Sequence, residues 1–432
     1  MKISAIKQIT YSATFALFLL KSPLLWAESS QELVTFDQIA RIAFEQNLGL
    51  RIEKQKRQTE LENKDATFKN LLPSLSLSSS ISDVLDNSAS SSNEITSFST
   101  SLVLQQSVYQ PALYASWKRS ELTLEKADQT LRRQAELLLF ELKKAWYSLL
   151  KEQILYTESE KSLARLKQHK KNAEAFYRNG EIWRNDLLQA QVRVARGEQE
   201  LFSAKNRLLL ARSQINLILN RSLDTDLKTQ AQLIQIDFNT PLETLNELAI
   251  SNRLDLKQNQ TDISIAKKDS DIARAGYKPS VNFTLSTGLS STEFNYDPST
   301  SETTAALNLS WNFWQFGQAR KEVAAAESKL RVARLQKEQK SAEILLEVRT
   351  AYLAVKESEH SLAVSEQALV QSNENFRISQ IRYKEQLGSS NDVLDAQDLL
   401  TQTETDRITA LSQYLTAIAE LNLAVGQGVK VE

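Results

Sequence analysis

The stretch N-D-V-L-D-A-Q at residues 391–397 matches the stretch N-D-L-L-Q-A-Q at residues 185–191, which lies 206 positions earlier in the chain. The same shift of 206 aligns Pro73-Ser74 with Pro279-Ser280, Tyr177 with Tyr383, and Asn216-Leu217 with Asn422-Leu423. Matches that extend along most of each half indicate an internal duplication. The sequence therefore predicts a fold with internal two-fold pseudo-symmetry.

Each half shows the same order of helices and strands. A short helix is expected at about 36–46 and 242–251, and a medium helix follows at about 48–71 and 254–277. Pro73 and Pro279 end the medium helices, because proline cannot continue a helix. After two strands, a very long helix is expected at about 112–177 and 319–384, and a returning helix at about 186–220 and 392–425. In the long helix the spacing of four and three is typical of closely packed helix pairs, as seen at Leu131, Ala135, Leu138, Leu142, Ala145 and Leu149.

The strands of each half alternate between apolar and polar side chains. Apolar residues occupy every second position from Val281 to Ser286 and from Ala305 to Phe313. In the first half Leu75 and Leu77 alternate with serines, and residues 98–108 form a weaker partner strand. Alternation of period two predicts strands with one apolar face. Aromatic residues at the end of the last strand predict a girdle at a bilayer surface, and these are Trp311, Phe313 and Trp314.

The composition excludes several classes of protein. The 432 residues contain only 9 Gly and 6 Pro, which argues against folds that need many tight turns, such as β-propellers and β-sandwiches. The formal net charge of −1 argues against a nucleic-acid-binding protein. The chain has no Cys and two His, so thiol chemistry and Cys/His zinc sites are excluded. We expect no enzymatic activity, no cofactor and no metal site.

The N-terminal residues 1–27 are interpreted as a signal peptide. A basic start precedes an apolar run from Tyr11 to Leu20, and the small residue Ala27 is followed by Glu28. A single membrane anchor is the alternative interpretation of this segment. No later apolar run reaches 18 residues, so we expect no membrane-spanning helix in the mature chain. The predicted organisation is repeat 1 at 28–220, a linker in an equatorial belt at 221–241, repeat 2 at 242–426 and a tail at 427–432.

Helix and strand lengths constrain the assembly. A long helix of about 65 residues spans about 98 Å, and the medium and returning helices together span about 88 Å, so they could stack end to end beside it. Four strands cannot close a barrel, and lipid does not tolerate unpaired strand edges. The chain is therefore expected to oligomerise. Three copies provide twelve strands, whereas the eight strands of two copies enclose too narrow a lumen for water.

The chain resembles the bacterial outer-membrane efflux protein family, the TolC-like exit ducts. The resemblance rests on the twofold repeat, on N-F-W-Q-F-G-Q at residues 312–318, and on Arg382-Tyr383 followed by D-V-L-D-A-Q at 392–397. It implies a mainly α fold with a membrane β-barrel part, in which each chain contributes four strands to the 12-stranded barrel of a homotrimer in contact with outer-membrane lipid. It also implies a periplasmic helical tunnel whose hairpin tips dock with a periplasmic adaptor protein and an inner-membrane pump.

The resemblance also assigns roles to residues at the two hairpin tips. Asp392 and Asp395 match aspartates that form acidic rings at the periplasmic entrance, although solvated acids at a helix N-terminus would show the same pattern. Tyr383 and Asp186 match a gate network, and we predict a hydrogen bond between them. Gly388 stands where a family member has the arginine of this network, so the gate is expected to differ here. The tip residues expected to dock with the adaptor are Gly180, Ile182, Trp183, Arg184, Leu387, Gly388 and Ser389.

Three functions stay open at the level of sequence. The first is a passive exit duct for small molecules in a tripartite efflux system. The second is the exit duct of a type I protein secretion system, which would have the same fold. The third is a soluble periplasmic coiled-coil adaptor, which explains the long helices but not the four alternating strands.

Overall fold

The computed structural model describes residues 34–83, 96–230, 232–291 and 301–427. The predicted signal peptide at 1–27 and residues 428–432 of the predicted tail lie outside the described residues. The elements of the first half are α1 (Phe36–Gln46), α2 (Leu48–Lys69), β1 (Ser74–Asp83), β2 (Thr96–Tyr109), α3 (Pro111–Arg178) and α4 (Arg184–Ile218). Those of the second half are α5 (Leu242–Asn252), α6 (Leu254–Arg274), the 3-10 turn η1 (Ala275–Tyr277), β3 (Ser280–Ser291), β4 (Ser301–Ser310), α7 (Gln318–Lys384) and α8 (Ser390–Val425).

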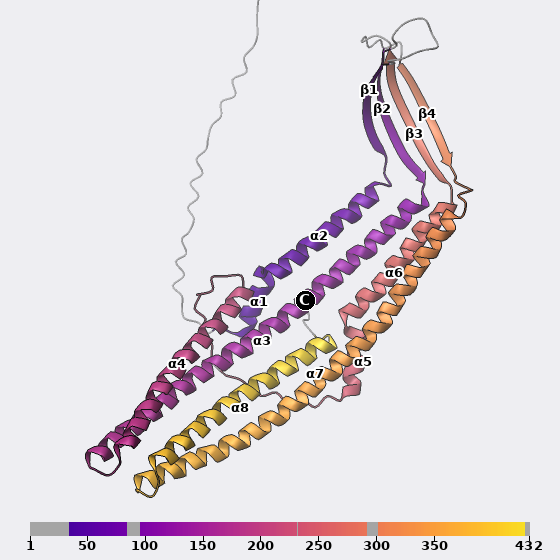
Figure 1. Cartoon of the computed structure of the whole chain (residues 1–432). Coiled ribbons are helices and arrows are strands. Elements are labelled where there is room, and N and C mark those ends of the chain that lie inside the picture. Colours follow the sequence, from indigo (N-terminus) through magenta and orange to yellow (C-terminus); the bar gives the residue numbers. More distant parts are fainter. Residues whose placement is uncertain (1–33, 84–95, 231, 292–300, 428–432) are drawn as a thin grey trace, which may run out of the picture.

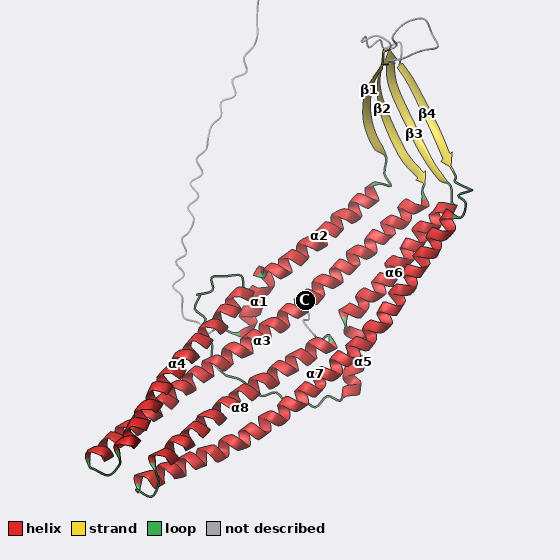
Figure 2. Ribbon diagram, in the orientation of Figure 1, coloured by secondary structure: helices red, strands yellow, loops and turns green. Residues whose placement is uncertain are grey.

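Figure 1 shows an elongated molecule with the strands at one end and two helical hairpins at the other. The long helix α3 packs against α2 and α6 on the strand side of the molecule and against α4 and α8 toward the hairpin end. The other long helix, α7, packs against α6 and α8. Figure 2 shows that the sheet stands apart from the helical layer and joins it through short connections. Consequently α2 and α4 form one lateral edge of the helical layer, and α7 forms the other.

The helices form two apolar cores near the middle of the molecule. One core joins the predicted heptad positions of α3, from Ala135 to Leu149, with residues of α1, α2 and α4. The second joins the equivalent positions of α7, from Ile344 to Val355, with α5, α6 and α8. Local signals set the helix ends: Thr35 and Gln38 form a capping box for α1, and α3 has Pro111 at its first position.

The linker between the halves crosses the helices as an extended segment. Leu227 is buried in the first core, and Thr229 bonds through its Oγ1 to Gln153 on α3 at 2.7 Å. Further along, the Tyr414 hydroxyl on α8 donates to the carbonyl of Ile236 at 2.7 Å. These contacts tie the linker to both long hairpins.

The sheet is antiparallel, with the order β1-β2-β3-β4. Its register places Leu75 opposite Leu104, Leu77 opposite Leu102 and Phe283 opposite Leu307, so one face is apolar. The other face is rich in hydroxyl groups. Serine pairs on that face are linked through their Oγ atoms at 2.7–2.9 Å, and these are Ser78–Ser101, Ser80–Ser99 and Ser82–Ser97. A sheet with one apolar and one hydroxylated face suits a wall between lipid and water.

The predicted extent of the last strand is wrong, because β4 ends at Ser310 rather than at Phe313. Trp311, Phe313 and Trp314 instead lie in the irregular segment that joins β4 to α7. The strand stops there because its partner β3 begins at Ser280, which pairs with Ser310. Beyond this point the Trp311 indole donates to the Tyr277 carbonyl at 3.1 Å. All three aromatic side chains are exposed, and so is Phe316, which contacts Trp314.

One helix of the described residues, α8, is long and apolar enough by composition to cross a membrane, which the sequence analysis did not anticipate. In its most apolar window 67% of the residues are buried inside the fold. Since α8 packs against both α7 and α3, its apolar residues belong to the core of the helical layer.

A buried arginine links the joint between α5 and α6 to the middle of α7 and to the end of α8. Arg253 is 2% exposed, and its guanidinium donates to both carboxylate oxygens of Asp255 and of Glu347 at 2.6–2.9 Å. It also donates to the carbonyl of Ala424 at 2.9 Å. Burial alone would raise the pKa of Asp255, but the hydrogen bonds and charge of Arg253 outweigh it and lower that pKa.

The first half has a neutral counterpart of this link, 206 positions earlier. Asn47 donates from its Nδ2 to the carbonyl of Ile218 at 2.9 Å, and its Oδ1 accepts from the backbone N–H of Leu50. In both halves the returning helix ends beside this link with a residue in the left-handed conformation, Asn220 at φ 52° and Gly426 at φ 73°. Both halves therefore fasten the end of the returning helix to the start of the medium helix.

We expect Arg253→Met to lower the free energy of unfolding by about 3–5 kcal/mol, because it leaves two carboxylates without their buried partner. Thermal unfolding of the purified protein measures this loss. The matched control is Arg377→Met, because Arg377 is exposed on α7 and pairs only with Glu374. Equal melting temperatures for the two variants would show that the Arg253 link does not stabilise the fold.

Candidate functional site

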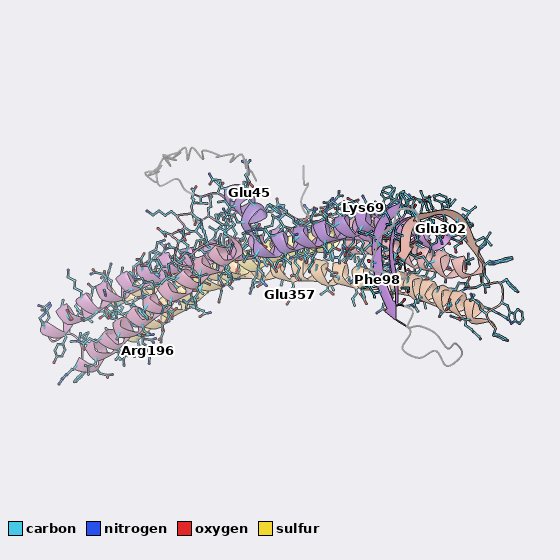
Figure 3. All side chains as sticks on the ribbon, turned by 90° about the horizontal axis from the view of Figure 1, so that it is seen from above. Glu45, Lys69, Phe98, Arg196, Glu302 and Glu357 are labelled. Carbon is cyan, nitrogen blue, oxygen red and sulfur yellow. The ribbon has the colours of Figure 1, made fainter. Side chains whose placement is uncertain are left out.

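The two hairpin turns lie next to each other at the end of the molecule opposite the sheet (Figure 1). In the view turned by 90°, Arg196 lies in this hairpin region, far from Phe98 and Glu302 of the sheet (Figure 3). The Gln386 amide on the second turn donates to the Glu181 carboxylate on the first turn at 2.9 Å. A direct hydrogen bond therefore joins the two tips within one chain.

Both turns have the same backbone structure, although their sequences differ. The N–H of Glu181 bonds to the carbonyl of Phe176 at 2.9 Å, and the N–H of Leu387 bonds to that of Arg382 at 2.7 Å. This pattern is the Schellman end of a helix, which needs one residue in the left-handed conformation. Gly180 supplies it in the first turn at φ 76°, and Gln386 adopts it in the second at φ 58°. The missing glycine therefore changes the strain of the second turn and not its shape.

Asp392 caps the helix α8 and remains exposed. Its carboxylate accepts from the Ser389 N–H at 2.9 Å, and the Ser389 hydroxyl accepts from the Asp392 N–H at 3.1 Å. The hydrogen bonds from the backbone and side chain of Ser389 lower the pKa of Asp392, so the group is ionised at neutral pH. Asp395, one turn later, is also exposed, and its side chain has a relative accessibility of 76%. Helix capping and exposure of both acids are thus compatible.

An arginine that no sequence motif marks lies beside these acids. Arg193 on α4 forms an ion pair with Asp398 on α8, and its Nη2 lies 3.5 Å from Asp395. The internal repeat could not indicate this residue, because the equivalent position in the second half is Leu399. Arg193 joins the first hairpin to the second and partly compensates the charge of Asp395.

Other polar contacts join the two hairpins between α3 and α8. Arg165 pairs with Glu404 at 2.9 Å, and the Ser162 hydroxyl bonds to that of Thr401 at 3.1 Å. The Gln397 amide donates to the carbonyl of Ser162 at 3.1 Å. The hairpins are therefore held to each other largely by hydrogen bonds and ion pairs, in addition to the apolar contact of Leu394 with the first hairpin.

The hydrogen bond predicted between Tyr383 and Asp186 is not formed in this chain. The Tyr383 ring is buried between Phe176 and His169, with ring centroids at 5.4 and 5.2 Å. Its hydroxyl has no hydrogen-bond partner among the described residues. Burial raises the pKa of Tyr383, the nearby Ser390 side chain opposes this rise, and the negative charge of Asp186 adds to it from a distance. The prediction failed because the ring packs into the interior instead of turning toward α4.

His169 occupies a buried position between the hairpins. Its Nε2 lies 2.9 Å from the Ser390 hydroxyl at the start of α8. A small cavity of about 270 Å³ adjoins it, lined by Arg165, Gln168, Asn172, Gln380, Lys384 and Gln397 among others. Burial lowers the pKa of His169, so the imidazole is neutral at neutral pH.

The outer surface of the tips is apolar at two points. Trp183 is 84% exposed on the first turn, and Leu387 is 72% exposed on the second. Gly180, Arg184 and Ser389 are also exposed, whereas Ile182 and Gly388 are half-buried. Exposed large apolar side chains on neighbouring turns are typical of a protein-binding surface. In the part of the chain that the structure describes, no group of three or more His, Asp or Glu side chains could hold a metal ion.

Comparisons with known proteins agree with this fold. Residues 245–427 match the family model described as outer membrane efflux protein. None of the curated proteins compared with the chain matches it. Solved structures with the same fold include the outer membrane protein VceC from Vibrio cholerae, with a TM-score of 0.76 and 16% identity over 90% of this chain and 96% of that chain. The Campylobacter jejuni CmeC outer membrane channel has a TM-score of 0.78 and 14% identity over 100% of this chain and 95% of that chain. The open state of the Neisseria gonorrhoeae MtrE outer membrane channel has a TM-score of 0.75 and 18% identity over 90% and 88%.

We expect the stability of the folded chain to fall as the pH drops below about 6.5, because the pKa of His169 is lower in the folded state than in the unfolded one. The unfolded chain then binds the proton first, which favours unfolding until the pH reaches the folded-state pKa. Melting temperatures measured between about pH 7.5 and 5.5 test this effect. His169→Gln should flatten the dependence, and the other histidine supplies the control, because His360→Gln at an exposed site should leave it intact.

Proposed function

Because residues 245–427 match the family model of outer membrane efflux proteins and the whole chain has the fold of outer membrane channels, we propose that it is the exit duct of a tripartite efflux system. It would conduct small molecules passively from an inner-membrane pump and a periplasmic adaptor to the exterior. The observation that carries the proposal is the family match across the second half of a chain whose whole length has the fold of outer membrane channels. A type I secretion duct would have the same fold, and the transporter paired with it decides between the two.

The protein lies in the bacterial outer membrane, with its helical part in the periplasm. As an exit duct it would be a channel and not an enzyme. The apolar face of the sheet contacts lipid, and the hydroxylated face contacts water. This arrangement does not fit the soluble coiled-coil adaptor that the sequence alone left open.

The edges of the sheet support a closed assembly. β1 and β4 are the outer strands, and no strand among the described residues pairs with their free sides. Unsatisfied backbone groups cost several kcal/mol each in lipid. Pairing of β4 of one copy with β1 of the next removes every edge when the ring closes. Three copies give twelve strands and a lumen wide enough for water, which supports a homotrimer.

The helical layer supports the same head-to-tail contact. Four apolar side chains are exposed on α7, namely Leu335, Leu346, Leu353 and Val364. They are separated by 11, 7 and 11 residues, and this spacing keeps them on one side of the helix. On the opposite lateral edge, α4 exposes Phe202, Leu209, Leu210 and Leu217. Each edge lies on the same side as the matching sheet edge, so one packing operation buries both.

The hairpin tips form the periplasmic entrance in this proposal. Asp392 and Asp395 of three α8 helices would form two acidic rings around the threefold axis, which favour cations. Arg193 provides an ion pair between the hairpins, which Gly388 cannot form because it has no side chain. The apolar tip residues Trp183 and Leu387 form the landing surface for the adaptor.

We expect a cation-selective conductance in planar bilayers, and Asp392→Asn should reduce the selectivity more than Asp395→Asn. The reason is that Arg193 lies 3.5 Å from Asp395, whereas Asp392 forms no ion pair among the described residues, accepts from the neutral Ser389, and feels the charge of Arg382 only as a smaller effect. Arg193→Gln should raise the selectivity by releasing two carboxylates. The measurement is the permeability ratio of potassium to chloride, with Asp65→Asn on the remote helix α2 as control. If none of these substitutions changes the permeability ratio, the constriction of the pore does not lie at the hairpin tips.

We expect the double change Trp183→Ser and Leu387→Ser to abolish efflux in cells while the conductance of the purified protein stays normal. Loss of two exposed apolar contacts weakens a protein interface, typically by more than tenfold for a buried tryptophan. Drug susceptibility of a strain that depends on this protein measures efflux. Ile234→Ser, which changes an exposed apolar residue of the linker, is the control. Normal efflux by the double variant would exclude these residues from adaptor docking.

A further inference from the structure

A cavity of about 650 Å³ lies where the strands join the helices. It is lined by the end of β2, the start of α3 and the last turns of α6, together with Leu71 before β1. Among its lining residues are four cationic side chains and one carboxylate, namely Lys118, Lys268, Arg274, Lys278 and Asp271. Nothing in the proposed path of small molecules uses this cavity.

The register of the sheet shows which face of the sheet the cavity adjoins. Tyr109, which lines the cavity, lies opposite Val281, and an irregularity of β2 between Ser107 and Tyr109 brings it there. Val281 shares a face with Phe283 and Leu285, which belong to the apolar side of the sheet. The Tyr109 side of the cavity therefore lies on the proposed lipid-facing side, at the end of the strands next to the helices, whereas Ser107, opposite Asn282, borders the other face.

The cations of this cavity are available to an external anion. Lys118 pairs with Glu121 and Lys268 with Asp271, both at 2.9 Å, and both are partly exposed pairs three residues apart on one helix. Such pairs are weak and exchange readily. Arg274 pairs with Glu327 on α7. The Lys278 ammonium is exposed and has no ion-pair partner among the described residues.

Amphipathic aromatic side chains surround the same cavity. Tyr109 and Tyr114 line it, and Trp117 stacks beneath Lys118, whose Nζ lies 3.9 Å from the ring centroid. Tyrosine and tryptophan concentrate at the level of lipid head groups, because one end of each ring system is apolar and the other is polar. A lysine held on an aromatic ring at this level is placed beside the phosphate layer of the membrane.

We propose that this cavity binds a glycerophospholipid of the periplasmic leaflet through its head-group phosphate. Lys118, Lys268 and Lys278 contact the phosphate oxygens, and Tyr109 and Tyr114 contact the glycerol and the first acyl carbons. The start of α3 at Pro111 adds the positive end of its helix dipole. Bound lipid would hold the four-stranded sheet at a fixed depth in the membrane. This inference rests on the membrane placement of the proposed function.

Native mass spectrometry of the detergent-solubilised protein tests the proposal with three probes. These are phosphatidylglycerol, diacylglycerol with the same acyl chains, and inorganic phosphate. The wild-type protein should retain phosphatidylglycerol and release the other two. Lys278→Gln should weaken retention by about fivefold, and Lys118→Gln/Lys268→Gln/Lys278→Gln by more than about tenfold. The control Lys167→Gln/Lys170→Gln/Lys171→Gln removes the same charge from the first hairpin and should retain the lipid.

Three outcomes would overturn the proposal. Equal retention of diacylglycerol would show that the acyl chains alone bind, and equal binding of inorganic phosphate would make the site an anion site rather than a lipid site. Equal retention by Lys278→Gln and wild type would exclude the cavity. If the triple variant does not fold, Lys278→Gln decides, because its side chain forms no ion pair that the fold could lose. Conductance measured on the same variants separates this proposal from the channel function, since a normal channel that binds no lipid refutes only the lipid site.

Discussion

The two unpaired edges of the four-stranded sheet impose the constraint on which the rest of the structure depends. In water such edges would be tolerable, but in lipid each unpaired backbone group is costly. A chain whose described residues provide only the strands β1 to β4 would therefore need to join a ring of copies in order to cross a membrane. When the strands of neighbouring copies pair, the helices of those copies must also pack against each other. The helical layer meets this requirement because its lateral edges, α7 on one side and α2 with α4 on the other, lie on the same sides as the sheet edges and expose apolar stripes.

The internal duplication explains why two hairpins with one backbone structure have different chemistry. The buried link at the end of the returning helix is neutral in the first half, with Asn47, and charged in the second, with Arg253. The left-handed turn position is Gly180 in one hairpin and Gln386 in the other, and Gln386 uses its side chain to reach Glu181 of its neighbour. A residue with a side chain thus accepts a backbone cost of about 1 kcal/mol and gains a contact between hairpins. Duplication preserved the shape, and local substitutions made the pair asymmetric.

Most of the fold could be predicted from the sequence, because its elements depend on local signals. Pro73 and Pro279 end the medium helices, heptad spacing predicts the long helices, and alternation predicts the strands. The site was harder, because its contacts join residues that are far apart in the chain. Arg193 meets Asp395 and Asp398 across 205 residues or so, and neither a motif nor the repeat marks it. The Tyr383 hydrogen bond failed for the same reason, since ring packing against Phe176 and His169 decides where the hydroxyl points.

The charges at the entrance have a consequence for how a duct of this kind opens. Within one chain Arg193 compensates Asp395 and Asp398, so the charge at the contact between α4 and α8 is low while the hairpins stay together. Any opening that moves α8 away from α4 must break these ion pairs and leave carboxylates unpaired in water. The cost is modest, because partly exposed pairs are weak. In the proposed duct, such an opening would expose the Asp395 and Asp398 carboxylates to ions without changing the net charge of the entrance, because Arg193 keeps its own charge. In this proposal, ion selectivity would depend on the hairpin tips, where the side chains of Asp392 and Asp395 are exposed.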